Sequence, residues 1–143
     1  MAYLTREPID AALWHAAAMD SSDGASVEFL GIVRGTEAGQ PIAALEYEAY
    51  EPMAERLIAR FEEEARRHWP LHGVHLRHRL GRVAVGEIAV LIAVTAAHRQ
   101  EAFEACRFLI DAIKQDAPIW KSAVSQDGTV LVIGVCVHGE PAH

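Results

Sequence analysis

A nearly unbroken apolar run, IAVLIAVTAA at residues 88–97, limits the folds open to this chain more than any other segment. A membrane-spanning helix needs about 20 apolar residues, so the run is roughly half the required length. Its continuity instead predicts a strand that is buried on both faces. Such a strand must lie inside a sheet with other elements packed over it, and the rest of the chain has to supply them.

Two long helical patterns lie on either side of this strand in the sequence. Residues 52–68 repeat apolar side chains at steps of three and four, with Glu–Arg pairs four residues apart on the exposed side. Residues 98–116 repeat the pattern, and we interpret Cys106 on the apolar face as a small core residue. Pro118 ends this second helix near Asp116, because proline removes a backbone donor and restricts the residue before it.

The other segments are predicted to be strands, apart from a short first helix at residues 6–19. The expected strands are 26–35, 42–50, a segment with a glycine break at 74–86, and two short strands about a turn at Asp127-Gly128. This order of elements predicts an α+β fold in which two main helices pack on a mostly antiparallel sheet. No repeat, low-complexity segment or long linker divides the chain, so residues 1–143 are expected to form a single domain.

Charge and cysteine content narrow the class of function. The formal net charge of −7 argues against a general nucleic-acid-binding protein, which would present a basic face. The net charge does not exclude a local cationic pocket, which would attract a small anion or an acidic peptide tail. The two cysteines, Cys106 and Cys136, form no metal motif, and the first residues are too polar for a signal peptide. We therefore expect a cytoplasmic protein with reduced thiols.

The two lysines of the chain, Lys114 and Lys121, stand seven residues apart on either side of Pro118, whereas arginine occurs eleven times. One interpretation is structural: Lys114 is a favourable cation in the last helical turn, and Lys121 is an exposed strand residue. The other is chemical, because a lysine can lose its proton when desolvated and can act as a compact donor or nucleophile, whereas arginine stays charged. This stretch alone leaves both interpretations open.

Three further side chains form a candidate anion-binding set. His98 and Arg99 fall where the apolar strand gives way to the second long helix, and the first turn of a helix offers free N–H groups. Arg99 opposes the helix dipole at that position, which favours a functional use, with His98 as a proton donor near neutral pH. Arg34 ends an apolar strand between Gly31 and Gly35, two residues that allow close approach by a ligand. For each of the three, a solvated loop or strand end is the alternative.

Four histidines occur in the stretch HWPLHGVHLRH, residues 68–78, but their spacing argues against a metal site. A proline and a glycine break any helix there, so His68 and His72 share no face. His75 and His78 lie three apart on a strand and point to opposite sides. No cysteine is near enough to complete a tetrahedral set. We expect neither a metal nor a cofactor, and the sequence contains no nucleotide-binding or serine-hydrolase motif.

A set of segments in fixed order carries a family resemblance: FLGIVRG, LEYEAYEPMAE, RHWPL and HRLGRVAVGEIAVLIAVTAAHRQEAFEACRFLIDAIKQDAPIWK. Together they resemble the large, catalytic subunit of molybdopterin synthase, over about residues 26–122. The most specific parts are AHR leading into the long helix, and the Lys114–Lys121 spacing with AP and WK inside it. The loop GTEAG after Arg34 and the apolar C-terminal segment 124–143 depart from the family pattern.

The resemblance implies an α/β hammerhead fold with a small additional β subdomain. It implies a sulfurtransferase of molybdenum cofactor biosynthesis, which converts cyclic pyranopterin monophosphate to molybdopterin without a cofactor of its own. The sulfur comes from the C-terminal Gly-Gly thiocarboxylate of a small ubiquitin-like partner subunit, whose tail inserts into a pocket. The large subunit of the family forms a homodimer at the core of a heterotetramer.

The resemblance also assigns site residues by matching position. It implies that Lys114 and Lys121 are catalytic residues beside the inserted tail, and that Arg34, His98 and Arg99 line the anionic substrate pocket. Since both reactants are anions, positive charge is needed to offset their repulsion. We expect Lys114 to contact the tail carbonyl, Lys121 to orient the pterin or help transfer protons, and His98 to act as acid or base.

Two other functions fit part of the sequence. A non-enzymatic dimeric scaffold or inactive paralogue would bind a Gly-Gly-ended small protein without needing an anion pocket. An anion-sensing domain would need no protein partner. The presence of Arg34, His98 and Arg99 together favours the enzyme over the scaffold. The apolar C-terminal residues are expected to pack either on a second copy of the chain or on the domain's own core: Leu131, Ile133 and Val135.

Overall fold

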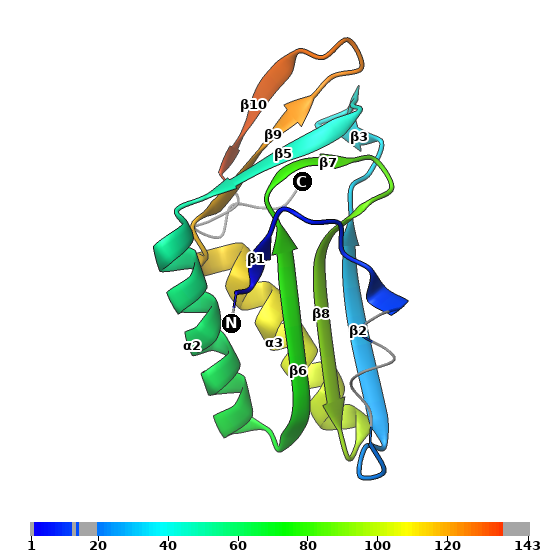
Figure 1. Ribbon diagram of the computed structural model, residues 1–143, viewed down its shortest axis with the longest axis vertical. Helices are drawn as coiled ribbons and strands as arrows, with labels where there is room; N and C mark the ends of the chain where they lie inside the picture. Colours follow the sequence, from blue (N-terminus) through cyan, green and yellow to red (C-terminus); the bar gives the residue numbers. More distant parts are fainter. Residues whose placement is uncertain (1, 13, 15–19, 136–143) are drawn as a thin grey trace.

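The computed structural model describes residues 2–12, 14 and 20–135 (Figure 1). This part of the chain forms two four-stranded sheets, two long helices and one short hairpin. Residues 13 and 15–19 of the predicted first helix, Cys136 and the side chains of residues 131–135 lie outside the described residues. The predicted start of that helix is wrong, because residues 6–10 are not helical and helix appears only from Ala11. The expected packing of Leu131, Ile133 and Val135 lies outside them as well.

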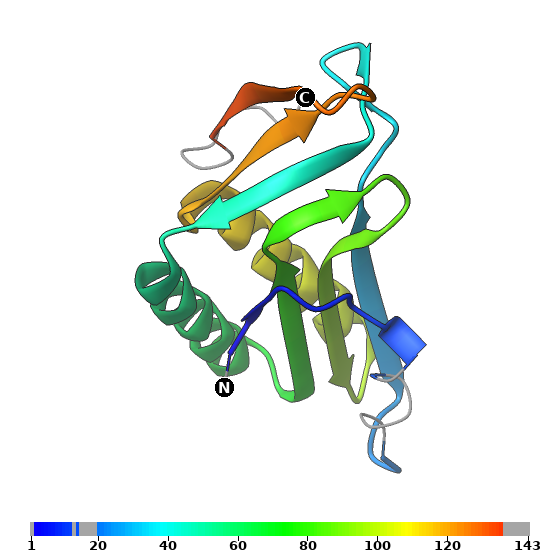
Figure 2. The same ribbon diagram turned by 45° about the horizontal axis from the view of Figure 1, so that its top comes forward.

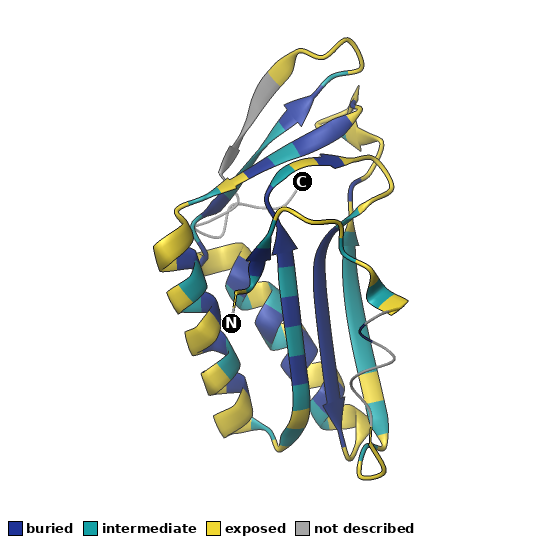
Figure 3. Ribbon diagram, viewed as in Figure 1, coloured by how far each residue is buried: buried dark blue, intermediate teal, exposed yellow. Residues whose placement is uncertain are grey.

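The first sheet contains the apolar run and has the strand order β1-β6-β8-β2. Strands β6 and β2 both pair antiparallel with β8, whereas β1 is parallel to β6. Every residue of β8 after Ile88 is buried, so the prediction of a strand covered on both faces is confirmed (Figure 3). The bounds of the strands are β1 (Leu4–Thr5), β2 (Ala25–Ile32), β6 (Leu71–Arg79) and β8 (Ile88–Ala96).

Two helices, α2 (Glu51–His68) and α3 (Arg99–Asp116), cover one face of this sheet (Figures 1 and 2). Both agree with the predicted ranges to within one residue. Cys106 is buried as predicted, and burial raises the pKa of its thiol to about 11. Each large side chain buried between the layers stabilises the fold by about 1.5–3 kcal/mol. The fully buried ones include Ile58 of α2, Leu76 of β6, Ile92 of β8 and Leu109 of α3.

The second sheet has the order β10-β9-β5-β7, is antiparallel throughout, and lies across one end of the first (Figure 2). The predicted strand 74–86 is divided between the two sheets, because Gly81 has a φ of 85° and turns the chain between β6 and β7. The expected turn at Asp127-Gly128 joins β9 to β10. The α+β class is thus confirmed. The bounds are β5 (Ala44–Ala49), β7 (Gly81–Ala84), β9 (Ile119–Val124) and β10 (Val130–Val135).

A short hairpin, β3 (Thr36–Glu37) and β4 (Gln40–Pro41), occupies the segment that the sequence predicts to be a loop. Ala38 and Gly39 form its turn, with φ angles of 51° and 79°. No helix within the described ranges is long and apolar enough to cross a membrane.

Candidate active site

The connection between α3 and β9 puts the two lysines on different elements. Ala117, the C-cap of α3, has extended φ and ψ angles of −73° and 134°, and its N–H still bonds back to the helix. Pro118 follows it, and the chain then becomes β9. Lys114 therefore lies in the last turn of α3, and Lys121 lies on a strand. The predicted helix end is confirmed.

Tyr47 of β5 is a neighbour of both lysines. It is the cross-strand partner of Lys121 in the β5–β9 ladder, so the two side chains are on the same face of the sheet. Tyr47 also lines a small cavity of about 20 Å³ together with Lys114 and His78. The buried Tyr47 is thus a neighbour of Lys121 in the sheet and of Lys114 at the cavity.

Lys121 is held by a carboxylate. Its Nζ lies 3.3 Å from Oε2 of Glu37, and the two side chains are 19% and 10% exposed. Glu37 belongs to β3, three residues after Arg34. A pair this sheltered from water interacts more strongly than a surface pair, because the effective dielectric constant around it is lower. The ion pair ties the β3–β4 hairpin to the strand that carries Lys121.

Lys114 shares its cavity with a buried imidazole, that of His78. The ring packs edge-on against Tyr47, with the ring centroids 5.1 Å apart. Its Nδ1 donates to the carbonyl oxygen of Arg79 at 2.8 Å. Burial is the main cause that lowers the pKa of His78 to about 4; the charge of Lys114 lowers it further, and the hydrogen bond to Arg79 opposes both. The ring is therefore neutral at neutral pH.

Arg34 lies at the same end of the first sheet as the lysines. It follows β2, where the Val33 N–H donates to the carbonyl of Glu87 just before β8. Its side chain is exposed. Gly31, in contrast, is required by packing, since a Cβ at this position would lie only 2.5 Å from Cγ1 of Val90. This glycine makes room for a neighbouring side chain, not for a ligand.

His98 and Arg99 lie at the opposite end of α3. His98 is the N-cap but makes no side-chain cap hydrogen bond, and its Nδ1 lies 3.5 Å from Oε2 of Glu101. Arg99 is the first residue of the helix and is exposed. Lys114 is fifteen positions after Arg99, which corresponds to about 22 Å along the helix. A single chain therefore brings Arg34 to the lysine end and leaves His98 and Arg99 away from it.

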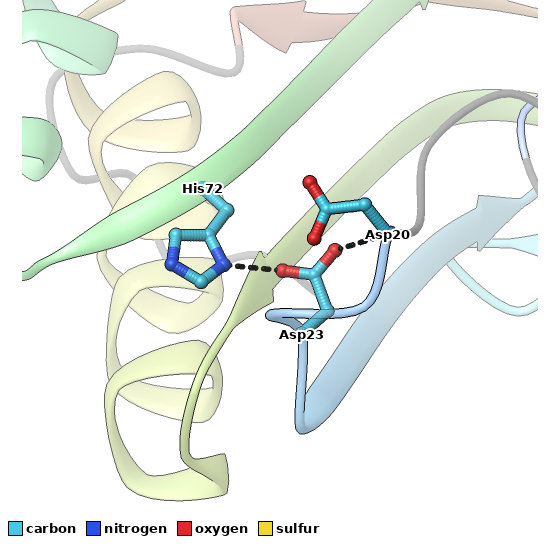
Figure 4. A group of neighbouring side chains, drawn as sticks. All are labelled: Asp20, Asp23 and His72. Atoms are coloured by element: carbon cyan, nitrogen blue, oxygen red, sulfur yellow. Dashed lines mark hydrogen bonds and ion pairs between the residues drawn. The ribbon is translucent and has the colours of Figure 1, made fainter.

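The described residues contain one group of potential metal ligands, Asp20, Asp23 and His72 (Figure 4). His72 Nδ1 lies 2.5 Å from Oδ1 of Asp23, whose Oδ2 accepts from the Asp20 N–H at 3.1 Å. Asp20 accepts from the hydroxyl and the N–H of Ser22, at 2.6 and 2.8 Å, and these bonds lower its pKa. Each carboxylate already has protein donors. The group is explained by closure of the loop before β2 onto the start of β6.

Three side chains near the lysines are not found by the sequence analysis: Glu37, Tyr47 and His78. The predicted opposite orientation of His75 and His78 is confirmed, since His75 packs against Trp14 and His78 against Tyr47. Alternation along β6 could have assigned His78 to the apolar face. Glu37 and Tyr47 approach Lys121 only through the hairpin and the β5–β9 register, which residue spacing does not reveal.

Three cationic side chains, Arg34, Lys114 and Lys121, thus lie toward the end of the first sheet that the second sheet covers. Residues 4–116 match the family model described as MoaE protein. This match covers more than half of the chain, so the chain belongs to the MoaE protein family. The resemblance drawn from the sequence is confirmed.

Several relatives and solved structures cover nearly the whole chain. The molybdopterin synthase catalytic subunit of Nostoc sp. strain PCC 7120 is 46% identical over 136 residues, which are 93% of this chain and 82% of that protein. The protein of the same name from Pyrococcus abyssi is 38% identical over 133 residues, 92% of this chain and 90% of that protein. The crystal structure of molybdopterin synthase from Staphylococcus aureus has a TM-score of 0.83 at 37% identity, covering 92% of this chain and 96% of that one. A protein–protein complex of subunits 1 and 2 of molybdopterin-converting factor from Helicobacter pylori has a TM-score of 0.74 at 25% identity, covering 98% and 91%.

Proposed function

We propose that this chain is the catalytic subunit of a molybdopterin synthase, a sulfurtransferase of molybdenum cofactor biosynthesis. It converts cyclic pyranopterin monophosphate to molybdopterin with sulfur from the C-terminal Gly-Gly thiocarboxylate of a small ubiquitin-like partner. The observation that carries the proposal is membership of the MoaE family, with relatives named molybdopterin synthase catalytic subunit at 38% and 46% identity. The Helicobacter pylori complex of two subunits supports a small partner for this chain.

Lys114, Lys121 and Arg34 supply the positive charge that this reaction needs. A thiocarboxylate and a cyclic phosphate are both anions, so bringing them together is unfavourable unless cations offset their repulsion. Lys114 contacts the tail carbonyl and stabilises the oxyanion that forms as the tail gives up its sulfur. Lys121 orients the pterin, and the guanidinium of Arg34 binds phosphate oxygens through several N–H donors.

A second copy of the chain supplies His98 and Arg99 in this proposal. In one chain these residues lie about 22 Å along α3 from Lys114, which is too far for one small substrate to bridge. Strand β2 is an edge of its sheet, and beside it a groove of about 860 Å³ runs along α3. The groove is lined in part by the apolar side chains Phe29 and Phe103, and Phe103 is 61% exposed.

Twofold symmetry at this groove explains how the two ends of α3 meet. A twofold axis perpendicular to β2 and α3 sets these elements of the two copies antiparallel, so the start of one helix lies beside the end of the other. His98 and Arg99 of one copy then reach Arg34 and the lysines of its partner. Burying the apolar groove favours this dimer by about 25 cal/mol for each Å² removed from water.

We also propose a cytoplasmic location and a single domain over residues 1–143. The location is supported by Cys106, which is a free and buried thiol in the part of the chain that the structure describes. The single domain is supported by the helices, which pack on one sheet while the chain passes several times between the two sheets.

A reconstituted reaction tests the proposed function. The purified chain is mixed with a thiocarboxylated carrier and the cyclic precursor, and the product is measured as its fluorescent oxidised derivative. We expect product only when all three are present, and none when the carrier ends in an ordinary carboxylate. A stable complex with the carrier that makes no product would favour the non-enzymatic scaffold. Absence of any complex would favour the anion-sensing domain.

A further inference from the structure

His78 is a buried titratable side chain to which the proposed chemistry gives no part. It is 7% exposed and lies on β6, on the face that packs toward α3. Its Nδ1 lies 2.8 Å from the carbonyl oxygen of Arg79, which can only accept, so the ring proton is on Nδ1. Nε2 is then the hydrogen-bond acceptor of the ring.

Burial keeps this acceptor uncharged. It lowers the pKa of His78 to about 4, so the ring stays neutral throughout the physiological range. A neutral imidazole with Nδ1 protonated accepts at Nε2 without adding a charge. Histidine is suited to this role because the hydrogen bond made by one ring nitrogen fixes the protonation state of the other.

The cavity next to His78 offers few other polar partners. His78, Tyr47 and Lys114 are its polar lining side chains, from β6, β5 and α3. Its volume of about 20 Å³ leaves room for roughly one water molecule. The charge of Lys114 is a lesser cause of the lowered pKa of His78, after burial. The remaining lining side chains are apolar: Val90, Ile110, Ile113 and Ile119.

We propose that His78 is a positioning residue for Lys114: Nε2 of the neutral ring accepts a hydrogen bond from the Lys114 ammonium and fixes where this charge is presented to the thiocarboxylate tail. The hydrogen bond between His78 and Lys114 does not depend on the proposed function; only its effect on catalysis rests on that function. A carboxylate in this place would also hold the ammonium but would compensate its charge, as Glu37 does for Lys121. A neutral acceptor orients the ammonium and leaves its charge available for an anion.

The lysine content of the chain allows a test that needs no enzyme assay. With ¹³C at the lysine Cε, the intact chain gives two side-chain signals, Lys114 and Lys121, which Lys121→Arg assigns. His78→Asn keeps a donor near Nδ1 and removes the acceptor, whereas His78→Gln places an amide oxygen near the position of Nε2. We expect the Lys114 signal to shift and its titration midpoint to fall in His78→Asn, and both to return toward wild type in His78→Gln. The Lys121 signal should stay unchanged.

His75→Asn is the matched control, because it changes a histidine of the same strand that packs on the opposite face. Thermal unfolding shows which variants are folded, and His78→Leu, which fills the ring's volume without an acceptor, replaces His78→Asn if that variant does not fold. A Lys114 signal and midpoint that match wild type in the folded variant would overturn the proposal.

Turnover gives the second readout. His78→Asn should lower kcat about tenfold or more with little change in KM, because a misplaced ammonium reduces stabilisation of the transition state more than it reduces binding of the substrate. His78→Gln should recover part of the lost kcat. Equal turnover numbers in the wild type and His78→Asn would also contradict the positioning role. Absence of product from the wild-type chain would count against the proposed function and not against the hydrogen bond, which the titration decides by itself.

Discussion

Lys114 and Lys121 both neighbour Tyr47 but have different electrostatic surroundings. Lys121 is paired with Glu37 at 3.3 Å, whereas Lys114 shares a cavity with the neutral ring of His78. A compensated charge is suited to binding and orientation. A charge beside a neutral acceptor is suited to stabilising negative charge that develops during the reaction. This difference is the physical basis for giving the two lysines separate roles.

Replacing Lys114 tests the larger of these roles. Lys114→Ala should lower turnover by about 10²-fold or more, since removal of one donor to an oxyanion typically has an effect of this size. Lys121→Ala should act more on KM for the precursor, because this lysine orients the substrate. Steady-state measurement of the fluorescent product separates kcat from KM. Near-wild-type turnover in a folded Lys114→Ala variant would remove the role given to this side chain.

The buried ring of His78 predicts sensitivity to acid. Burial lowers its pKa from 6.5 to about 4 on folding, so between these values the unfolded chain binds more protons than the folded chain. The unfolding free energy should therefore fall as the pH drops through this window, with about 3 kcal/mol from His78 at 1.36 kcal/mol per pH unit. Denaturant titrations across the window measure this decline. An equally steep decline in His78→Gln would assign it to other groups.

Helix α3 begins with residues that are poor for its own stability. His98 occupies the N-cap without making a side-chain cap hydrogen bond, and Arg99 brings a positive charge to the positive end of the helix dipole. Serine, asparagine or aspartate at the cap, and an acidic residue after it, would stabilise the helix more. Residues that reduce the stability of their own helix are expected where their side chains act in a functional site.

Changing the N-cap should separate stability from activity. His98→Asn is expected to raise the unfolding free energy by about 0.5–1 kcal/mol, because its side chain can accept from the free N–H groups of the first turn. Turnover should fall, since the imidazole is lost. His98→Ala is the control: it removes the imidazole without adding a cap, so activity should fall with no gain in stability. Thermal unfolding and the product assay measure the two effects, and full activity in either variant would exclude a role for His98.

The elements that depend on local signals are predictable from the sequence, and the pairings between distant segments are not. The apolar run, the two helices and the stop at Pro118 each follow from neighbouring residues. Gly81 predicts a break but not that the strands on either side join different sheets. Tyr47 and Lys121 are 74 residues apart in the sequence, and His72 and Asp23 are 49 apart. Neither contact can therefore be predicted from the spacing of residues along the chain.

The assembled protein combines an acidic chain with a cationic site. The formal net charge is −7, yet Arg34, Lys114 and Lys121 lie at one end of the fold. Negative charge elsewhere on the surface disfavours nonspecific polyanions, while the local cations select small anions that fit the pocket. In the proposed dimer, His98 and Arg99 of the second copy increase this local charge further.

Mixing two inactive variants tests whether the site is shared between copies. When Lys114→Ala and Arg99→Ala chains are dissociated and reassembled together, about half of the dimers are mixed, and each mixed dimer has one intact site. About a quarter of wild-type activity should return. Lys114→Ala mixed with Lys121→Ala is the control, since both changes affect the same copy's end of the site and neither mixed site is intact. Both mixtures are assayed at a precursor concentration well below the raised KM of Lys121→Ala, where this variant also has little activity. No recovery in the first mixture, or equal recovery in both, would exclude the shared site.

The length of α3 has a consequence for how the chain can vary. Arg99 is its first residue and Lys114 lies in its last turn, so the helix fixes both the distance and the rotation between them. One residue inserted between them would advance Lys114 by about 1.5 Å and turn it by about 100°. In a twofold dimer each α3 contributes to both sites, so this single insertion would disturb both at once. Insertions are therefore expected in the β3–β4 and β9–β10 turns, and excluded from the eighteen residues of α3.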